Sequence, residues 1–259
     1  MKAYSSFPGQ SEMLNGSSPS RLALLATWLA LPVYAWQGLG VRRRTSRLLP
    51  AAGPVTGAID GAEPDVVLLV LGDSSAASVG IDQIERGLTA QLAQLIAASS
   101  GCAVRWRAAG FNSVTSGQIR DLVVPNLKRD PYTHIVVAVG TNDIKNFHSL
   151  PRFKREFGGL LYALRAKWPE ASIVWQPVIA FTDVPALPSA LAGLLETRAR
   201  GINALGARLC LERGALPAER LPVTDAAAGF SSDGFHASEA GYRAWAEHLL
   251  PFVLGERST

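Results

Sequence analysis

The sequence predicts a three-layer α/β/α domain, in which a mostly parallel, five-stranded sheet lies between two layers of helices. Short, continuously apolar runs alternate, over residues 65–254, with longer segments whose apolar residues recur at helical spacing. Alternating strands and helices favour right-handed crossover connections and a single parallel sheet covered on both faces. The length of 259 residues and the hydrophobic content of 48% suit one such domain with an extension.

The expected strands are the apolar and β-branched runs. The first covers residues 66–71, a continuous apolar run of the kind found in central parallel strands. The next three cover residues 102–108, 134–139 and 172–177, and a short last strand is expected over residues 221–224.

Helices are expected where apolar residues recur every three or four positions. Four such ranges are residues 81–96, 119–127, 153–168 and 191–209. Residues 242–250 show the clearest pattern, with apolar residues at i, i+3, i+4, i+7 and i+8.

The N-terminal region differs from the rest in composition. Residues 1–21 are rich in Ser, Gly and Pro and are expected to be disordered, and residues 45–64, with several Pro and Gly, are expected to be a linker. Residues 22–41 carry no charge and are long enough to cross a bilayer. With the three arginines that follow, residues 22–44 form a candidate membrane anchor.

The basic cluster Arg42, Arg43 and Arg44 predicts on which side of the membrane the domain lies. The positive-inside rule would keep the cluster and the domain after it in the cytoplasm, at an inner membrane. A cleaved signal sequence, with an exported or periplasmic domain, is the alternative. A helix that packs on the domain or lies at the membrane interface is a third possibility.

The charge distribution argues against a nucleic-acid partner. The formal net charge is +4, and residues 1–50 alone carry six basic side chains and one acidic side chain. The rest of the chain is therefore nearly neutral, at about −1, and offers no basic face of the kind that binds nucleic acid.

Polar residues follow three of the expected strands. Asp73 and Ser74 come after the first, Gly110 after the second and Asn142 after the third. Ligands of a parallel sheet bind beyond the carboxyl ends of its strands, so we expect these residues to lie on one rim.

Three side chains provide the parts of a serine nucleophile. Ser74 needs a base to take its proton, and His236 is the natural base. Asp233, three residues before His236, would orient the imidazole and stabilise its charged form. The backbone N–H groups of Ser74 and Gly110, with the side-chain amide of Asn142, would hold the oxyanion. We expect position 110 to be glycine because a side chain there would crowd the substrate's carbonyl oxygen.

Asp73 and Asp143 invite a second hypothesis. Together with Asp233 and His236 they could hold magnesium or manganese in a metal-dependent phosphohydrolase. The favoured role of the two aspartates is hydrogen bonding that supports the loops around the nucleophile and the amide. No metal ion and no organic cofactor is therefore expected.

The remaining histidines and cysteines are assigned no chemistry. His134, His148 and His248 are expected to be structural or exposed. Cys102 and Cys210 lack the paired spacing of a zinc site or a disulfide framework. In the loop after the fourth strand, residues 181–188, Phe181 and Leu187 are expected to line an acyl pocket.

In sequence order, these blocks resemble the SGNH, or GDSL, hydrolase family. The matching residues are the Gly-Asp-Ser that ends at Ser74, then Gly110, the Gly-Thr-Asn-Asp of residues 140–143 and the Asp-Gly-Phe-His that ends at His236. The resemblance covers about residues 65–254 and defines an expected hydrolase domain over residues 65–255. It implies a flavodoxin-like fold and an esterase or lipase that hydrolyses esters or thioesters through an acyl-enzyme.

Departures from the family pattern leave the substrate open. Ser75 stands where the family name has leucine, and Ala237 follows the histidine where proline is common. Ala76 takes the place of the second glycine in the G-x-S-x-G elbow of α/β-hydrolases. The alternatives are a carbohydrate O-acetyl esterase or acyltransferase of the same fold, and a catalytically silent domain that binds acyl or glycan ligands. The complete set of site residues argues against the silent domain.

Overall fold

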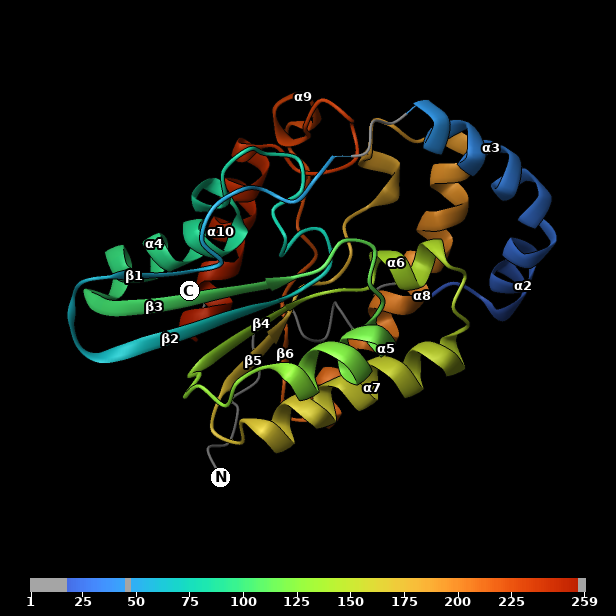
Figure 1. Cartoon of the computed structure of the whole chain (residues 1–259). Helices are drawn as coiled ribbons and strands as arrows, with labels where there is room; N and C mark the ends of the chain where they lie inside the picture. Colours follow the sequence, from blue (N-terminus) through green and yellow to red (C-terminus); the bar gives the residue numbers. More distant parts are fainter. Residues whose placement is uncertain (1–17, 45–47, 256–259) are drawn as a thin grey trace.

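The computed structural model describes residues 18–44 and 48–255. Of the segment 1–21 that was predicted to be disordered, residues 1–17 lie outside the described residues, and Ser20 and Arg21 begin the first described helix. Its centre is a six-stranded sheet with the spatial order β1-β3-β2-β4-β5-β6 (Figure 1). All neighbouring strands are parallel except β1 and β3, which are antiparallel. The strands are β1 (Thr56–Ile59), β2 (Ala62–Gly72), β3 (Cys102–Gly110), β4 (His134–Ala138), β5 (Ser172–Trp175) and β6 (Leu216–Pro217).

Helices cover both faces of the sheet, which confirms the predicted three-layer α/β/α fold (Figure 1). On one face lie α4 (Leu88–Ser100) and α10 (Glu239–Leu254). On the other lie α5 (Ser116–Gln118), α7 (Leu150–Lys167) and α8 (Ser189–Glu212). The shorter elements are α6 (Thr141–Lys145), α9 (Ala226–Gly229), η1 (Ile84–Arg86), η2 (Ile119–Val123), η3 (Val124–Asn126) and η4 (Phe181–Asp183).

The central strand β2 shows why its sequence is continuously apolar. Leu69 and Leu71 point into the core beneath α7 and α8, whereas Leu68 and Val70 point into the core beneath α4 and α10. All four side chains are fully buried. Burying one such side chain stabilises the fold by about 1.5–3 kcal/mol. This strand therefore holds the sheet in place and fixes where its carboxyl end, and the site, will lie.

The prediction of five strands was wrong, because the sheet has six. The additional strand, β1, comes from residues 45–64, which were expected to be a linker. Gly57 of β1 resembles a linker residue, but a Cβ there would lie 2.5 Å from the indole of Trp106 on β3. A glycine therefore lets the strand lie flat over that ring.

Two expected elements begin or lie elsewhere. The last strand is β6, not residues 221–224, and it pairs with β5 through Trp175 and Pro217. The helix expected from residue 81 begins at Leu88. The preceding segment packs against the turn after β2, where a Cβ on Gly87 would lie 1.8 Å from Ser78 Oγ. Tertiary packing therefore overrides the helical spacing of residues 81–87.

The predicted anchor consists of two helices, α2 (Arg21–Leu29) and α3 (Leu31–Arg44). Within the part of the chain that the structure describes, no single helix is long and apolar enough to cross a membrane. Arg21–Leu29 and Leu31–Val41 satisfy that test together, but they are bent by 64°. Both helices contact α8 (Figure 1).

Candidate active site

Ser74 lies in the turn that follows β2. The N–H of Asp73 donates to the carbonyl of Ala138 on β4 (3.0 Å), and the N–H of Val79 donates to the carbonyl of Ser74 (3.0 Å). A Cβ at Gly72 would lie 2.1 Å from the oxygen of Ala138, so only glycine lets the two strands end this close together. The turn presents a half-buried Ser74 at the carboxyl rim of the sheet.

His236 and Asp233 form a tight pair in the loop before α10. Nδ1 of His236 lies 2.6 Å from Oδ2 of Asp233. The Asp233 side chain is fully buried and that of His236 is 19% exposed. Because Nδ1 faces the carboxylate, Nε2 is the ring nitrogen left for a proton transfer.

The loop holds the Asp233 carboxylate in its charged form. Its other oxygen, Oδ1, accepts hydrogen bonds from the N–H groups of Phe235 (2.8 Å) and His236 (2.9 Å) and from Ser231 Oγ (2.9 Å). Burial alone raises the pKa of Asp233, but the bonds from His236 and Phe235 outweigh burial and hold that pKa well below its usual range. Gly234, with φ +66°, makes the tight turn possible. An ionised Asp233 is thus in position to orient and stabilise the imidazole.

Ser74 and His236 line the same cavity, which has a volume of about 220 Å³. The rest of its wall is largely apolar. Phe181 lines it, as predicted, whereas Leu187 lines a separate surface hollow. The aliphatic and aromatic wall residues include Val139, Val178, Ile179, Phe181, Val184 and Phe235.

Asn142 lies in the first turn of α6 and is buried. Its side-chain Nδ2 donates to the carbonyl of Val114 (3.0 Å) and, at 3.4 Å, to Oδ2 of Asp73. The amide is therefore held between the loop after β3 and the residue that precedes Ser74. Neither Asn142 nor Gly110 is among the described residues that line the cavity.

Gly110, at the end of β3, has to be glycine for a reason other than the one predicted. A Cβ there would lie 1.9 Å from the nitrogen of Ala77 and 2.2 Å from the carbonyl carbon of Ala76. The glycine therefore makes room for the turn that carries Ser74, rather than for a substrate oxygen.

Asp73 and Asp143 are both buried and act as hydrogen-bond acceptors. Oδ1 of Asp73 accepts from the N–H and the hydroxyl of Ser75, both at 3.1 Å. Burial raises the pKa of Asp73, although these bonds from Ser75 oppose the shift. Asp143 accepts from the N–H (3.0 Å) and the hydroxyl (2.6 Å) of Ser116, which ties α6 to α5.

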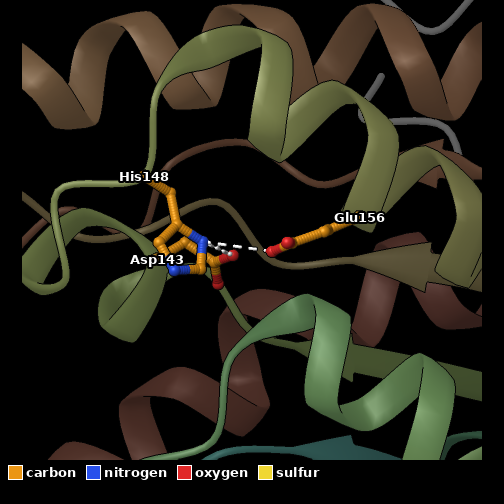
Figure 2. Close-up of side chains that lie close together, drawn as sticks. All are labelled: Asp143, His148 and Glu156. Carbon is orange, nitrogen blue, oxygen red and sulfur yellow. Dashed lines mark hydrogen bonds and ion pairs between the residues drawn. The ribbon is translucent and has the colours of Figure 1, made fainter.

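The four residues of the metal hypothesis do not gather. Among the described residues, one group of three His, Cys, Asp or Glu side chains brings its ligand atoms within 4.8 Å of one another, and it consists of Asp143, His148 and Glu156 (Figure 2). Asp233 and His236 contact each other in the loop before α10 and belong to no such group of described residues. His148 was expected to be structural or exposed, and Glu156 was not predicted to belong to a site. An acid, a histidine and a second acid follow one another within residues 143–156, and this short spacing was the sequence signal that could have predicted the group.

Comparison with known proteins identifies a family and a shared fold. The model of the GDSL-like lipase/acylhydrolase family matches residues 70–244. No curated protein matches the chain significantly.

Solved structures share the fold at low sequence identity. A protein named TesA is 20% identical with a TM-score of 0.58, and the match covers 71% of this chain and 96% of TesA. The esterase EstA from Pseudoalteromonas sp. is 16% identical with a TM-score of 0.56, over 73% and 97% of the two chains. The family 3 carbohydrate esterase of Clostridium thermocellum is 14% identical with a TM-score of 0.55, over 74% and 98%.

Proposed function

The chain belongs to the GDSL-like lipase/acylhydrolase family, and from that premise we propose that it hydrolyses carboxylic esters or thioesters through an acyl-enzyme on Ser74. The observation that supports this proposal most strongly is the shared cavity, whose wall contains both Ser74 and His236. The 2.6 Å contact between His236 and Asp233 adds the residue that orients the base. A serine and a histidine thus share one apolar cavity, and a carboxylate contacts the histidine, which supports the proposed roles of nucleophile, base and orienting group.

The reaction follows from these positions. Nε2 of His236 takes the proton as Ser74 Oγ attacks the carbonyl carbon, and the charged imidazole donates from Nδ1 to Asp233. His236 then protonates the leaving alcohol or thiol, and the acyl group remains on Ser74. A water activated by His236 attacks the acyl-enzyme, releases the carboxylic acid and restores the serine.

Three donors are proposed to stabilise the tetrahedral intermediate. They are the N–H groups of Ser74 and Gly110 and the side-chain amide of Asn142. One amide proton of Asn142 is held by Val114 at 3.0 Å, whereas the contact with Asp73 at 3.4 Å is long for a hydrogen bond. The second proton is therefore the one that can turn to an oxyanion. Asp73 and Asp143 act in support, by holding the turn at Ser74 and the helix that carries Asn142.

The apolar wall favours an aliphatic acyl group over the acetyl group of a sugar. Each methylene that the cavity buries contributes about 0.8 kcal/mol, which corresponds to about a fourfold gain in kcat/KM. An O-acetyl group offers one methyl to this wall. Sugar O-acetyl hydrolysis and acyl transfer remain the alternatives within the same mechanism, and a catalytically silent domain that binds acyl or glycan ligands remains the alternative outside it.

The test is hydrolysis of p-nitrophenyl esters from acetate to palmitate by the full-length protein and by Ser74→Ala. We expect kcat/KM to rise from acetate to medium chains, and Ser74→Ala to lower kcat at least about 10³-fold. Ser75→Ala, which changes the neighbouring serine, is the matched control. Activity retained in Ser74→Ala would overturn the mechanism, and activity confined to acetylated sugars would favour the sugar esterase. The silent domain would be favoured if the protein binds esters but neither hydrolyses them nor becomes labelled at Ser74 by a fluorophosphonate.

We also propose that α2 and α3 hold the protein at a membrane. Leu22, Leu25, Leu29 and Trp36 are between 61% and 85% exposed. The basic residues 42–44 follow this surface in the sequence and suit anionic headgroups. We expect the protein to sediment with anionic vesicles and the double variant Leu25→Asp, Leu29→Asp to remain in solution.

A reporter fused to the C-terminus should be active in the cytoplasm, and activity in the periplasm would instead support export.

A further inference from the structure

We propose that Asp143, His148 and Glu156 form a buried site for a divalent cation of the zinc type, next to the helix α6 that carries Asn142. The three side chains come from α6, from the loop after it and from the second turn of α7. Figure 2 shows them converging on one region between these elements. The site is separate from the proposed catalytic cavity, whose wall includes none of the three residues.

The distances suit a shared cation. Nδ1 of His148 lies 3.1 Å from Oδ1 of Asp143 and 3.2 Å from Oε2 of Glu156. Zinc binds nitrogen and oxygen ligands at about 2.0–2.2 Å in tetrahedral geometry, which places neighbouring ligand atoms about 3.3 Å apart. One imidazole and two carboxylates, with a water in the fourth position, form a donor set that zinc accepts.

Glu156 provides an independent sign of a ligand-binding position. The residue is only 8% exposed, and its Oε2 accepts no hydrogen bond from any described residue. Nδ1 of His148 lies 3.2 Å away, but it carries at most one proton and faces Asp143 as well. Burying a carboxylate oxygen without a partner costs free energy of folding. This oxygen therefore needs either a cation or a proton in addition to the one on Nδ1 of His148.

The outer oxygens of both carboxylates are already held in place. Oε1 of Glu156 accepts from Arg152 Nε at 2.8 Å, and Oδ2 of Asp143 accepts from the N–H of Ser116 at 3.0 Å. Such partners orient the ligands of a metal. The inward Oδ1 of Asp143 also accepts from the Ser116 hydroxyl at 2.6 Å, and its second lone pair remains for a cation. The dication would also offset the repulsion between two carboxylates that lie together in the interior.

Gly117 shows that the chain makes room for Glu156. A Cβ at this position would lie 2.9 Å from both Cδ and Oε2 of Glu156. The carboxylate therefore occupies space that the side chain of any residue other than glycine at position 117 would fill. Gly117→Ala displaces one proposed ligand while all three ligand residues remain.

The site would act on the position of Asn142, the proposed oxyanion donor on α6. Asp143 is adjacent to Asn142, and through Ser116 it is tied to the loop whose Val114 carbonyl holds the Asn142 amide. A bound cation would fix α6, α5 and α7 against one another. Its role is therefore positional, and neither the nucleophile nor the base depends on it.

The test is metal binding by tag-free, full-length protein after treatment with a chelator. We expect one equivalent of Zn²⁺ or Co²⁺ to bind, with the intense visible bands of tetrahedral Co²⁺. His148→Gln and Glu156→Gln should lose this spectrum, and Gly117→Ala should weaken binding at least about tenfold. His248→Gln and Glu170→Gln, which lie outside the site, are the matched controls.

The wild-type spectrum decides the proposal even where a variant fails to fold. A chelated wild-type protein that binds neither Zn²⁺ nor Co²⁺ at tens of micromolar would overturn it, and the three side chains would then share only a proton. Binding that persists in a folded His148→Gln would overturn it as well. Ser74→Ala should bind the cation like the wild type, so the failure of the esterase proposal would leave this result unchanged.

Discussion

The molecule contains two Asp–His pairs that look alike in sequence and differ in their surroundings. Asp233 and His236 are three residues apart, their closest atoms are 2.6 Å apart, and the histidine opens on an apolar cavity. Asp143 and His148 are five residues apart and 3.1 Å apart, and the histidine side chain is only 3% exposed. A second carboxylate, Glu156, faces His148.

The difference shows that access, rather than residue type, decides what an Asp–His pair can do. A base must exchange its proton with a substrate, so its second ring nitrogen has to reach a cavity. A histidine enclosed by two carboxylates can share a proton or a cation but cannot deliver a proton to an ester. We therefore expect the two pairs to respond to the same substitutions in opposite ways.

The largest effect should come from Asp233→Asn. The asparagine keeps the shape of the loop but cannot stabilise a charged imidazole, so kcat should fall about 10⁴-fold. Steady-state hydrolysis of a p-nitrophenyl ester measures this loss. Asp143→Asn is the matched control in the other pair, and an equal loss of kcat there would remove the distinction between the pairs.

Asn142→Ala should have the next largest effect. Loss of one oxyanion donor lowers kcat about 10²–10³-fold and leaves KM nearly unchanged. Thr141→Ala, which changes a neighbouring residue of the same helix that lines the cavity, is the control. A loss that appears only in KM would assign Asn142 to substrate binding instead.

His148→Gln should cost stability more than activity. It removes a buried partner of Asp143 and Glu156, so the free energy of unfolding should fall by about 1–3 kcal/mol, measured by urea denaturation. The activity of the folded variant should fall by no more than about tenfold, because His148 reaches no substrate. A variant as inactive as His236→Gln and as stable as the wild type would place His148 in the chemistry.

The sequence allowed the sheet and the rim that carries Ser74 and Asn142 to be predicted for a common reason. Residues 66–71 are apolar because helices cover both faces of β2, and such burial leaves a continuous signal in the sequence. Ser74 and Asn142 follow strands, so the topology alone brings them to one rim. Their roles in catalysis stay predictions.

The features that could not be predicted from the sequence depend on contacts between distant segments. From the sequence alone Gly57 resembles a linker residue, and only the fold places Trp106 against it. Gly110 is required by the nearby backbone of Ala76 and Ala77 rather than by a substrate. Glu156 resembles a surface residue of an amphipathic helix, and only the fold places Gly117 and His148 against it. None of these contacts leaves a periodic pattern.

The smallest expected effect tests the electrostatics of the Asp233–His236 pair through the dependence of stability on pH. Hydrogen bonds hold the pKa of Asp233 below its unfolded value of about 3.9, so its contribution is complete above that pH and is lost as the pH falls through the lower, folded pKa. Urea denaturation at pH 6 and pH 3 should therefore show a smaller loss of stability in Asp233→Asn than in the wild type. Asp60→Asn, at an exposed loop position, should lose as much stability as the wild type. Equal losses in Asp233→Asn and the wild type would mean that Asp233 is not held in its charged form by the loop, and the proposed role of this pair would lose its electrostatic basis.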